Sequence, residues 1–210
     1  MQTDKYGAYY FNSNKSSIFT PKSNTLYSYK VYIGQQTIDL EQGDCLYYIS
    51  DDRQKAILKS GQQTINSLHC ATVVRGYNPP QKSNSLTQQT FLPYVNGCSS
   101  RQVFSPERLG DPTMQILYLP PYTSEQAHHI HSTVRVVYCL DGVGDSVVGM
   151  KNHITKTELK AGMVIVLEEM SPHHFETQNN HLKVVPLHIY SSIGSLEFNH
   201  PMFNGTHSIE

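Results

Sequence analysis

Short stretches in which apolar residues alternate with polar ones recur along nearly the whole chain of 210 residues, and turn-forming residues separate them. Alternation with a period of two is typical of β-strands, whereas the 3.6-residue period of an amphipathic helix is scarce here. The pattern predicts an all-β sandwich or barrel, with a single helical turn at most over 106–109. The expected strands are 26–33, 36–40, 45–50, 54–59, 70–75, 114–119, 134–140, 145–150, 154–158, 163–167 and 182–190.

The two halves of the chain share a weak similarity, which bears on the number of domains. The segment 37–48, with Gly43 at its centre, resembles the segment 157–166, with Gly162 at its centre, if one residue of slip is allowed. A repeat of this kind predicts a first β module over 1–90 and a second over 91–210, joined by the polar stretch 77–86. Chance similarity between short β-rich segments is the alternative that the sequence leaves open.

Charge and composition narrow the classes of partner. The chain has 38% hydrophobic residues, 16% charged residues and a formal net charge of −1, without a basic stripe. Nucleic acids and anionic membranes are therefore poor candidate partners. No run of 18 apolar residues and no apolar signal-peptide core is present, and the four cysteines form no CxxC pair. We expect a cytoplasmic protein with free thiols.

Histidines are the best indication of chemistry. Most of the 11 histidines lie between positions 128 and 188. His129 and His131 share one face of a β-strand because side chains alternate with a period of two, and His128 faces the other way. A further histidine from a second cluster, at His173 or His174, could complete a set of three nitrogens that leaves open positions on a metal ion.

These residues carry a resemblance to the cupins, a superfamily of small jelly-roll barrels. The first cupin motif is His-x-His, then a glutamate, then a strand that ends in glycine; His129-Ile130-His131 followed by a strand and Gly142 is similar to it. The second motif runs from a glycine along an apolar strand to a histidine after proline, which 162–173 resembles. The resemblance implies a cupin barrel over 91–210. It leaves open whether 1–90 is a degenerate second cupin, as in a bicupin, or an extension of one barrel.

The resemblance also implies a ligand set and an assembly. By alignment with the family motifs, His129, His131 and His173 hold a divalent metal ion, His174 points outward, and Phe175 points inward to close a substrate pocket. Fe(II) is the expected ion, while Ni, Zn or Mn would also accept imidazole ligands. Cupins commonly pair through edge strands, so a homodimer is expected.

The chain departs from the cupin pattern at Arg135, which stands where metal-binding cupins usually have their glutamate ligand. A guanidinium group has no free lone pair and stays protonated, so it cannot bind a metal ion. Arg135 is an even number of residues from His129 and His131, so alternation along the strand predicts that its side chain also points into the barrel. Either Arg135 binds a substrate carboxylate beside a three-histidine metal, or the metal site has decayed and Arg135 pairs with a structural acid.

Other side chains are candidates for roles in the pocket. His188 lies in the last long strand and could act as an acid or base, and Tyr122 and Glu125 lie in a loop before the first motif, where a phenol or carboxylate could transfer a proton. Glu168 or Glu169 could provide a fourth ligand or hydrogen-bond to a ligand imidazole.

The leading functional hypothesis is a metal-dependent cupin enzyme. It would be a non-haem Fe(II) dioxygenase-type oxidoreductase that acts on a small carboxylate-bearing substrate, with Arg135 and Phe175 in the substrate pocket and His188 and Tyr122 as catalytic groups. A non-catalytic cupin that binds a small ligand, a metal-dependent lyase or isomerase, and a metal-independent sugar isomerase or epimerase are the alternatives.

Overall fold

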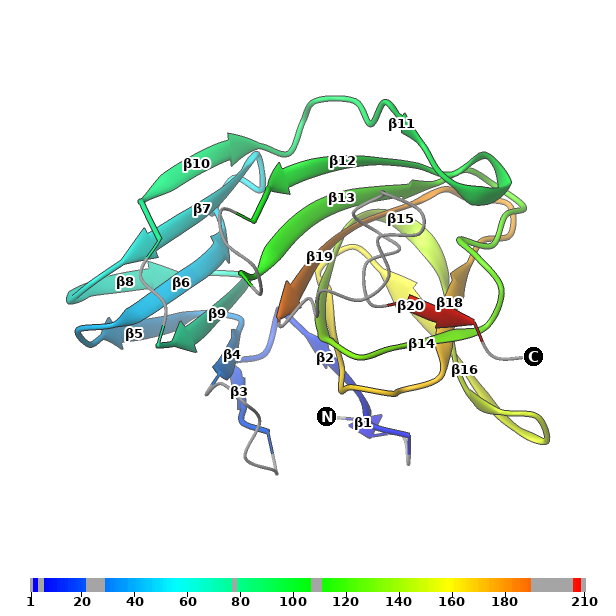
Figure 1. Cartoon of the computed structure of the whole chain (residues 1–210), viewed down its shortest axis with the longest axis horizontal. Helices are drawn as coiled ribbons and strands as arrows, with labels where there is room; N and C mark the ends of the chain where they lie inside the picture. The colour runs from blue at the N-terminus through cyan, green and yellow to red at the C-terminus, as the bar shows by residue number, and fades with distance from the viewer. Residues whose placement is uncertain are drawn as a thin grey trace. The chain divides into compact units, whose positions relative to one another are not determined.

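The computed structural model describes residues 6–21, 29–76, 79–106 and 111–189, and the backbone of 2–3 and 206–208. Regular structure in these residues is almost entirely β-strand, as predicted (Figure 1). The chain divides into two compact units, one made of residues 1–10 and 89–210 and the other of 11–88. Most of the helical turn predicted over 106–109 lies outside the described residues. The part of the chain that the structure describes contains no helix long and apolar enough to cross a membrane.

The unit of residues 11–88 is built from two antiparallel sheets. A six-stranded sheet has the order β10-β7-β6-β9-β4-β3, and β5 pairs with β8 in a separate sheet. Apolar side chains from β5, β6 and β9 form a common buried cluster, so the two sheets bury each other's apolar faces. The strands are β3 (Ser17–Phe19), β4 (Tyr29–Ile33), β5 (Gln36–Leu40), β6 (Asp44–Ile49), β7 (Lys55–Ser60), β8 (Gln63–Ser67), β9 (Cys70–Arg75) and β10 (Lys82–Ser85).

The prediction of a linker over 77–86 is wrong for its second half. Lys82–Ser85 form strand β10, which pairs with β7 in the register Lys82↔Leu58. Ladder hydrogen bonds need only the backbone, so an edge strand tolerates polar side chains that give no apolar pattern. The structure divides at 88/89, and residues 1–10 group with the C-terminal unit, where the Glu168 N–H donates to the Gly7 carbonyl (2.9 Å). A degenerate cupin in the N-terminal half stays a prediction.

The other unit contains the sheet path β1-β2-β17-β15-β19-β13-β12-β11, to which β14, β16, β18 and β20 are attached, and these strands curl into a barrel (Figure 1). Its core gathers buried apolar residues from most of these strands. The strands are β1 (Gln2–Thr3), β2 (Ala8–Asn12), β11 (Leu92–Pro93), β12 (Ser99–Phe104), β13 (Thr113–Leu119), β14 (His129–His131), β15 (Val134–Met150), β16 (His153–Lys160), β17 (Met163–Leu167), β18 (His173–Glu176), β19 (Leu182–Ile189) and β20 (Thr206–Ser208).

Strand β15 is one continuous strand of 17 residues, where the sequence predicted two separate strands, 134–140 and 145–150. Its first part pairs with β17 and β19, and its second part pairs with β16 and β18. The register against β19 shifts between Cys139 and Asp141, and Gly142 follows with a φ of 83°. A bulge followed by a left-handed glycine bends the strand, so that β15 connects β18 to the rest of the barrel.

Candidate metal centre

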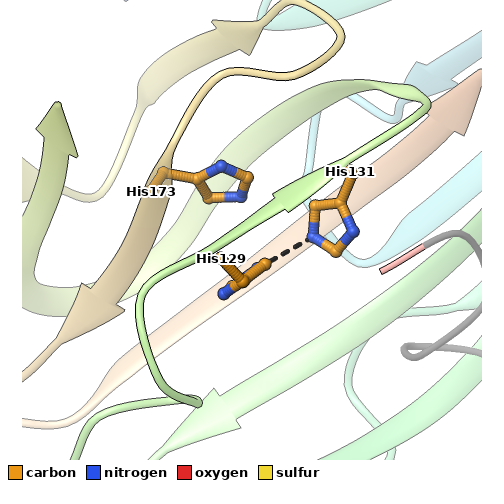
Figure 2. Close-up of side chains that lie close together, drawn as sticks. All are labelled: His129, His131 and His173. Carbon is orange, nitrogen blue, oxygen red and sulfur yellow. Dashed lines mark hydrogen bonds between the residues drawn. The ribbon is translucent and has the colours of Figure 1, made fainter. Parts of the chain in front are cut away.

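Three histidines from two neighbouring strands lie together inside the barrel (Figure 2). Strands β14 and β18 are antiparallel, and their register sets His129 directly opposite His173. Alternation along β14 brings His131 to the same side as His129. The ring centroid of His129 lies 4.6 Å from that of His131 and 4.7 Å from that of His173. One nitrogen from each of the three rings lies within 4.8 Å of the other two.

The outer nitrogens of two of these rings are held by backbone carbonyls. His129 Nδ1 donates to the carbonyl of Ala127 (2.8 Å), and His173 Nδ1 donates to that of Ser171 (2.7 Å). A carbonyl can only accept a hydrogen bond, so in each neutral ring the proton is on Nδ1 and the lone pair is on Nε2. His129 Nε2 lies 2.9 Å from His131 Nε2. Backbone acceptors on the outer nitrogens are the usual support of metal-binding histidines.

Burial keeps the three imidazoles in the neutral form that binds metal. His129, His131 and His173 are 0%, 6% and 3% exposed. Loss of hydration lowers the pKa of His129 to about 3 and lowers the pKa values of His131 and His173 well below the ordinary value. The Arg135 cation nearby lowers all three pKa values further. Protons therefore compete weakly for these nitrogens at neutral pH.

The donor set fits a divalent first-row metal ion with open coordination positions. Three neutral imidazoles suit Fe, Ni, Zn and Cu ions alike. Within the described residues, no carboxylate or thiol belongs to the three-histidine group, so Glu168 and Glu169 are not part of it. Glu168 instead accepts a hydrogen bond from the Tyr9 hydroxyl (3.4 Å) at Oε2.

A small pocket, partly open to solvent, lies beside the three histidines. Apolar and polar side chains share its wall, which is typical of sites for small molecules. The lining residues are Leu117, Glu125, Gln126, His131, Arg135, Val137, Leu167, His173, Phe175, Pro186 and His188. Phe175 and Arg135 thus line the pocket into which the sequence predicted that they point.

Arg135 and His188 are register partners on β15 and β19, so both side chains lie on the pocket side of the sheet. Arg135 is 3% exposed, and its Nη1 donates to the Thr133 hydroxyl, whereas its Nη2 has no hydrogen-bond partner among the described residues. Burial lowers the pKa of Arg135 to about 9, so it stays charged at neutral pH. His188 Nε2 also lacks a partner in the described chain, and burial, with the charge of Arg135, holds its pKa well below the ordinary value.

Glu125 is a pocket residue whose environment the sequence did not reveal. It is buried, its N–H donates to the Phe175 carbonyl (3.0 Å), and its Oε1 accepts a hydrogen bond from the Phe175 N–H (3.1 Å). Burial raises the pKa of Glu125 to about 7, and the Phe175 N–H and the Arg135 charge oppose this rise. No sequence signal distinguished Glu125 from its loop neighbours, because its position depends on a tertiary contact, the bridge between Ser124 and Glu176.

Two other predicted candidates lie away from the three histidines. Tyr122 does not line the pocket: its side chain is 73% exposed and its hydroxyl donates to Asn179 Oδ1 (2.5 Å). We therefore assign no catalytic role to Tyr122. His174 faces away from the three-histidine group, as the alternation along β18 requires, and meets His128 instead.

Comparisons with known proteins give a likeness in fold alone. No family model matches the chain, and no curated protein sequence matches it. The protein named "Putative Glyoxylate Induced Protein" from Pseudomonas aeruginosa is similar in structure, with a TM-score of 0.58 and 9% identity over 86% of this chain and 80% of that one. A cupin 2 conserved barrel domain protein from Leptotrichia buccalis has a TM-score of 0.51 and 16% identity over 86% and 96%. A variant of the salicylate 1,2-dioxygenase from Pseudoaminobacter salicylatoxidans has a TM-score of 0.50 and 10% identity over 77% and 71%.

Proposed function

This chain has the fold of the cupin superfamily, and on that premise we propose that it is a metal-dependent enzyme, a non-haem Fe(II) dioxygenase-type oxidoreductase acting on a small carboxylate-bearing substrate. One observation carries the proposal: three buried neutral imidazoles and a buried arginine with an unused donor share one pocket. The imidazoles suit a metal ion and the arginine suits an anion.

His129, His131 and His173 would hold the metal ion. When bound, Fe(II) with open positions supplies oxygenase chemistry. We propose Fe(II) because three uncharged ligands leave room for an anionic substrate and O₂, and because a dioxygenase is among the proteins that share this fold. Ni, Zn and Mn are the other ions considered for these ligands.

Arg135 would bind the substrate carboxylate through Nη2. The guanidinium is buried and charged, and within the described residues that nitrogen has no acceptor. A carboxylate would supply the missing acceptor, and charge-assisted hydrogen bonds are stronger than neutral ones. Leu117, Val137 and Phe175 supply apolar wall to the same pocket.

His188 would contact the substrate as a neutral imidazole. It lies opposite Arg135 in the strand register, and its Nε2 has no partner among the described residues. Because burial and Arg135 keep its pKa well below the ordinary value, His188 is not charged at neutral pH. It would therefore hydrogen-bond to the substrate and would not donate a proton as an imidazolium.

A metal-dependent lyase or isomerase is the second candidate, and Glu125 is the observation that favours it. A pKa of about 7 lets this carboxyl group both take and give a proton at neutral pH, which general acid–base reactions require. Such a reaction would proceed without consuming O₂, so the two candidates predict different products and different oxygen uptake.

The test begins with protein loaded with Fe(II) under nitrogen. Nitric oxide, a probe of open iron positions, should give the electron paramagnetic resonance signal of a high-spin iron–nitrosyl species in wild type and in His153→Ala, which removes an exposed histidine, but not in His131→Ala. Pairs of small acids and their methyl esters are then compared with an oxygen electrode. The proposal expects oxygen uptake with an acid and none with its ester. Conversion of an acid without oxygen uptake would favour the lyase or isomerase, and absence of the nitrosyl signal would contradict the iron site.

A further inference from the structure

The pocket contains two buried groups of opposite charge that are not bonded to each other. Arg135 and Glu125 both line it and are both 3% exposed. Each affects the other, because Arg135 lowers the pKa of Glu125 and Glu125 raises that of Arg135. Within the described residues no ion pair joins them, and Arg135 Nη2 has no acceptor. An anion and a hydrogen-bond donor on one small molecule would satisfy both.

Glu125 is held in place by Phe175 at two points. Its N–H donates to the Phe175 carbonyl (3.0 Å), and its Oε1 accepts from the Phe175 N–H (3.1 Å). The hydrogen bond from Phe175 uses Oε1, so within the described residues Oε2 is the oxygen that remains for a ligand in the pocket. An ionised carboxylate has only acceptor sites, so the group that meets Oε2 must be a donor.

We propose that Glu125 is a specificity-determining residue that selects small acids with a hydroxyl group on the carbon next to the carboxylate, that is, 2-hydroxy acids. Arg135 Nη2 binds the carboxylate and Glu125 Oε2 accepts the hydroxyl hydrogen. This inference rests on the proposed carboxylate site at Arg135 and goes beyond it by naming the substrate class.

Burial makes the selection strong. Because Glu125 is only 3% exposed, an acid without a hydroxyl covers its carboxylate without supplying a donor, and the protein bears that desolvation cost on binding. Sites built to hydrogen-bond a substrate hydroxyl reject analogues that lack it far better than apolar pockets reject an extra methylene group. A hydrogen bond to a charged acceptor corresponds to about 10-fold to 100-fold in affinity.

The same contact allows the substrate hydroxyl to transfer its proton to Glu125, and this step needs no other reactant. The O–H bond of the substrate breaks, its electron pair stays on the substrate oxygen, and the proton moves to Glu125 Oε2. Burial gives Glu125 a pKa of about 7, which suits a group that gains and loses a proton at neutral pH.

Calorimetric binding of three matched acids tests the inference, both in metal-free protein and in protein loaded with Zn(II), which is redox-inert. The acids are lactate, propionate, and 2-methoxypropionate, which keeps the oxygen but has no donor. At about pH 8, where Glu125 is mostly ionised, lactate should bind about 10-fold to 100-fold more tightly than the other two. Glu125→Gln presents an amide NH₂ to the pocket, which donates to a hydroxyl or ether oxygen and accepts from neither, so the preference for lactate over 2-methoxypropionate should be lost. Glu158→Gln changes a glutamate on the exposed face of β16 and should keep it.

The Arg135→Gln variant distinguishes failure of the carboxylate site at Arg135 from failure of the role of Glu125. If all three acids bind wild type equally, with affinity that depends on Arg135, the carboxylate site stands and the role of Glu125 is overturned. If no acid binds wild type, or if Arg135→Gln leaves binding unchanged, the carboxylate site itself is overturned, and the substrate class with it. A preference for lactate over 2-methoxypropionate that persists in Glu125→Gln also overturns the role of Glu125.

Discussion

His173 and His174 are adjacent in β18, yet their imidazoles lie on opposite faces of the strand and in different kinds of contact. His173 joins the inner group, in which the nitrogens of His129 and His131 are 2.9 Å apart and their ring centroids 4.6 Å apart. On the outer face, His174 Nδ1 lies 2.8 Å from His128 Nδ1 although the ring centroids are 5.1 Å apart. Both pairs meet at steep angles, 89° between the outer rings and 77° between the inner ones, but only the inner pair has a third imidazole, that of His173, beside it.

The first prediction separates these two adjacent histidines. Replacing His173 by alanine should abolish tight metal binding, because it removes one of three ligands. Replacing His174 by alanine should leave the metal stoichiometry unchanged, because its imidazole faces away from the inner group. Equilibrium dialysis against Zn(II) or Fe(II) under nitrogen, followed by elemental analysis, measures both variants in parallel. Equal loss of metal in the two variants would contradict the assignment of faces.

The second prediction concerns the cost of Arg135 to stability. A buried cation with an unpaired donor is unfavourable in the absence of substrate, and replacing such groups by apolar ones is often neutral or stabilising by about 1–4 kcal/mol. The Arg135→Met variant should therefore unfold at the same or a higher temperature than wild type, while its affinity for small carboxylates falls by about 10-fold or more. Scanning calorimetry and binding titrations measure the two effects.

A clear loss of stability in Arg135→Met would favour the alternative that the sequence left open, in which the arginine is a structural ion-pair partner in a decayed metal site. The structure gives that alternative little support, since Arg135 forms no ion pair within the described residues. An Arg135→Lys variant is a useful companion, because it keeps the charge and removes the guanidinium fork.

The third prediction follows from the raised pKa of Glu125. A carboxyl group whose folded-state pKa is about 7, above the unfolded value, stabilises the fold most at acidic pH, and this contribution is lost as pH rises from about 4.5 to 7. Glu125→Gln should therefore gain stability relative to wild type over this range, by about 3 kcal/mol in total. Urea unfolding of both metal-free proteins at several pH values measures the difference. A difference that does not vary with pH would contradict the burial of an ionisable Glu125. Acid destabilisation by the buried histidines is common to both proteins and cancels.

The fourth prediction tests the bend in β15. A side chain at Gly142 would clash with the His181 carbonyl and would also be strained by the φ of 83°. Gly142→Ala should destabilise the barrel by about 2–4 kcal/mol. Gly43→Ala, at a turn where φ is also positive and a Cβ meets nothing, isolates the backbone strain and should cost about 1–2 kcal/mol. Thermal unfolding that ranks the two variants in the reverse order would contradict the close approach at Gly142.

Much of the fold was predictable because a strand with one buried face has apolar and polar residues in alternation. The strands β5, β9 and β17 begin and end at the predicted residues, and β15 was predicted in two pieces. The polar edge strand β10 was missed because its pairing uses backbone groups and leaves no apolar signal. The sequence predicted that a strand ends near Gly142. In the structure the strand continues, and the positive φ of Gly142 allows it to bend.

The sequence predicted the site residues whose direction follows from side-chain alternation along a strand. It was less able to predict residues whose position depends on tertiary contacts. The odd-numbered residues His129, His131 and Arg135 point into the barrel as alternation requires. Glu125 and Tyr122 looked equivalent in the sequence, since both precede the same strand. Only the bridge to β18 distinguishes them, because it buries Glu125 opposite Phe175 while Tyr122 stays 73% exposed.

Elemental analysis of protein purified without chelator and without a histidine tag tests the central claim most directly. Wild type and His153→Ala, which alters an exposed histidine, should contain about one divalent metal ion per chain, and His131→Ala should contain almost none. The identity of that ion, iron or another, decides which reaction to assay. Absence of metal from all three proteins, even after incubation with Fe(II), Ni(II), Zn(II) or Mn(II), would contradict the three-histidine metal centre, and the pocket around Arg135 would then be a binding site for a small anion.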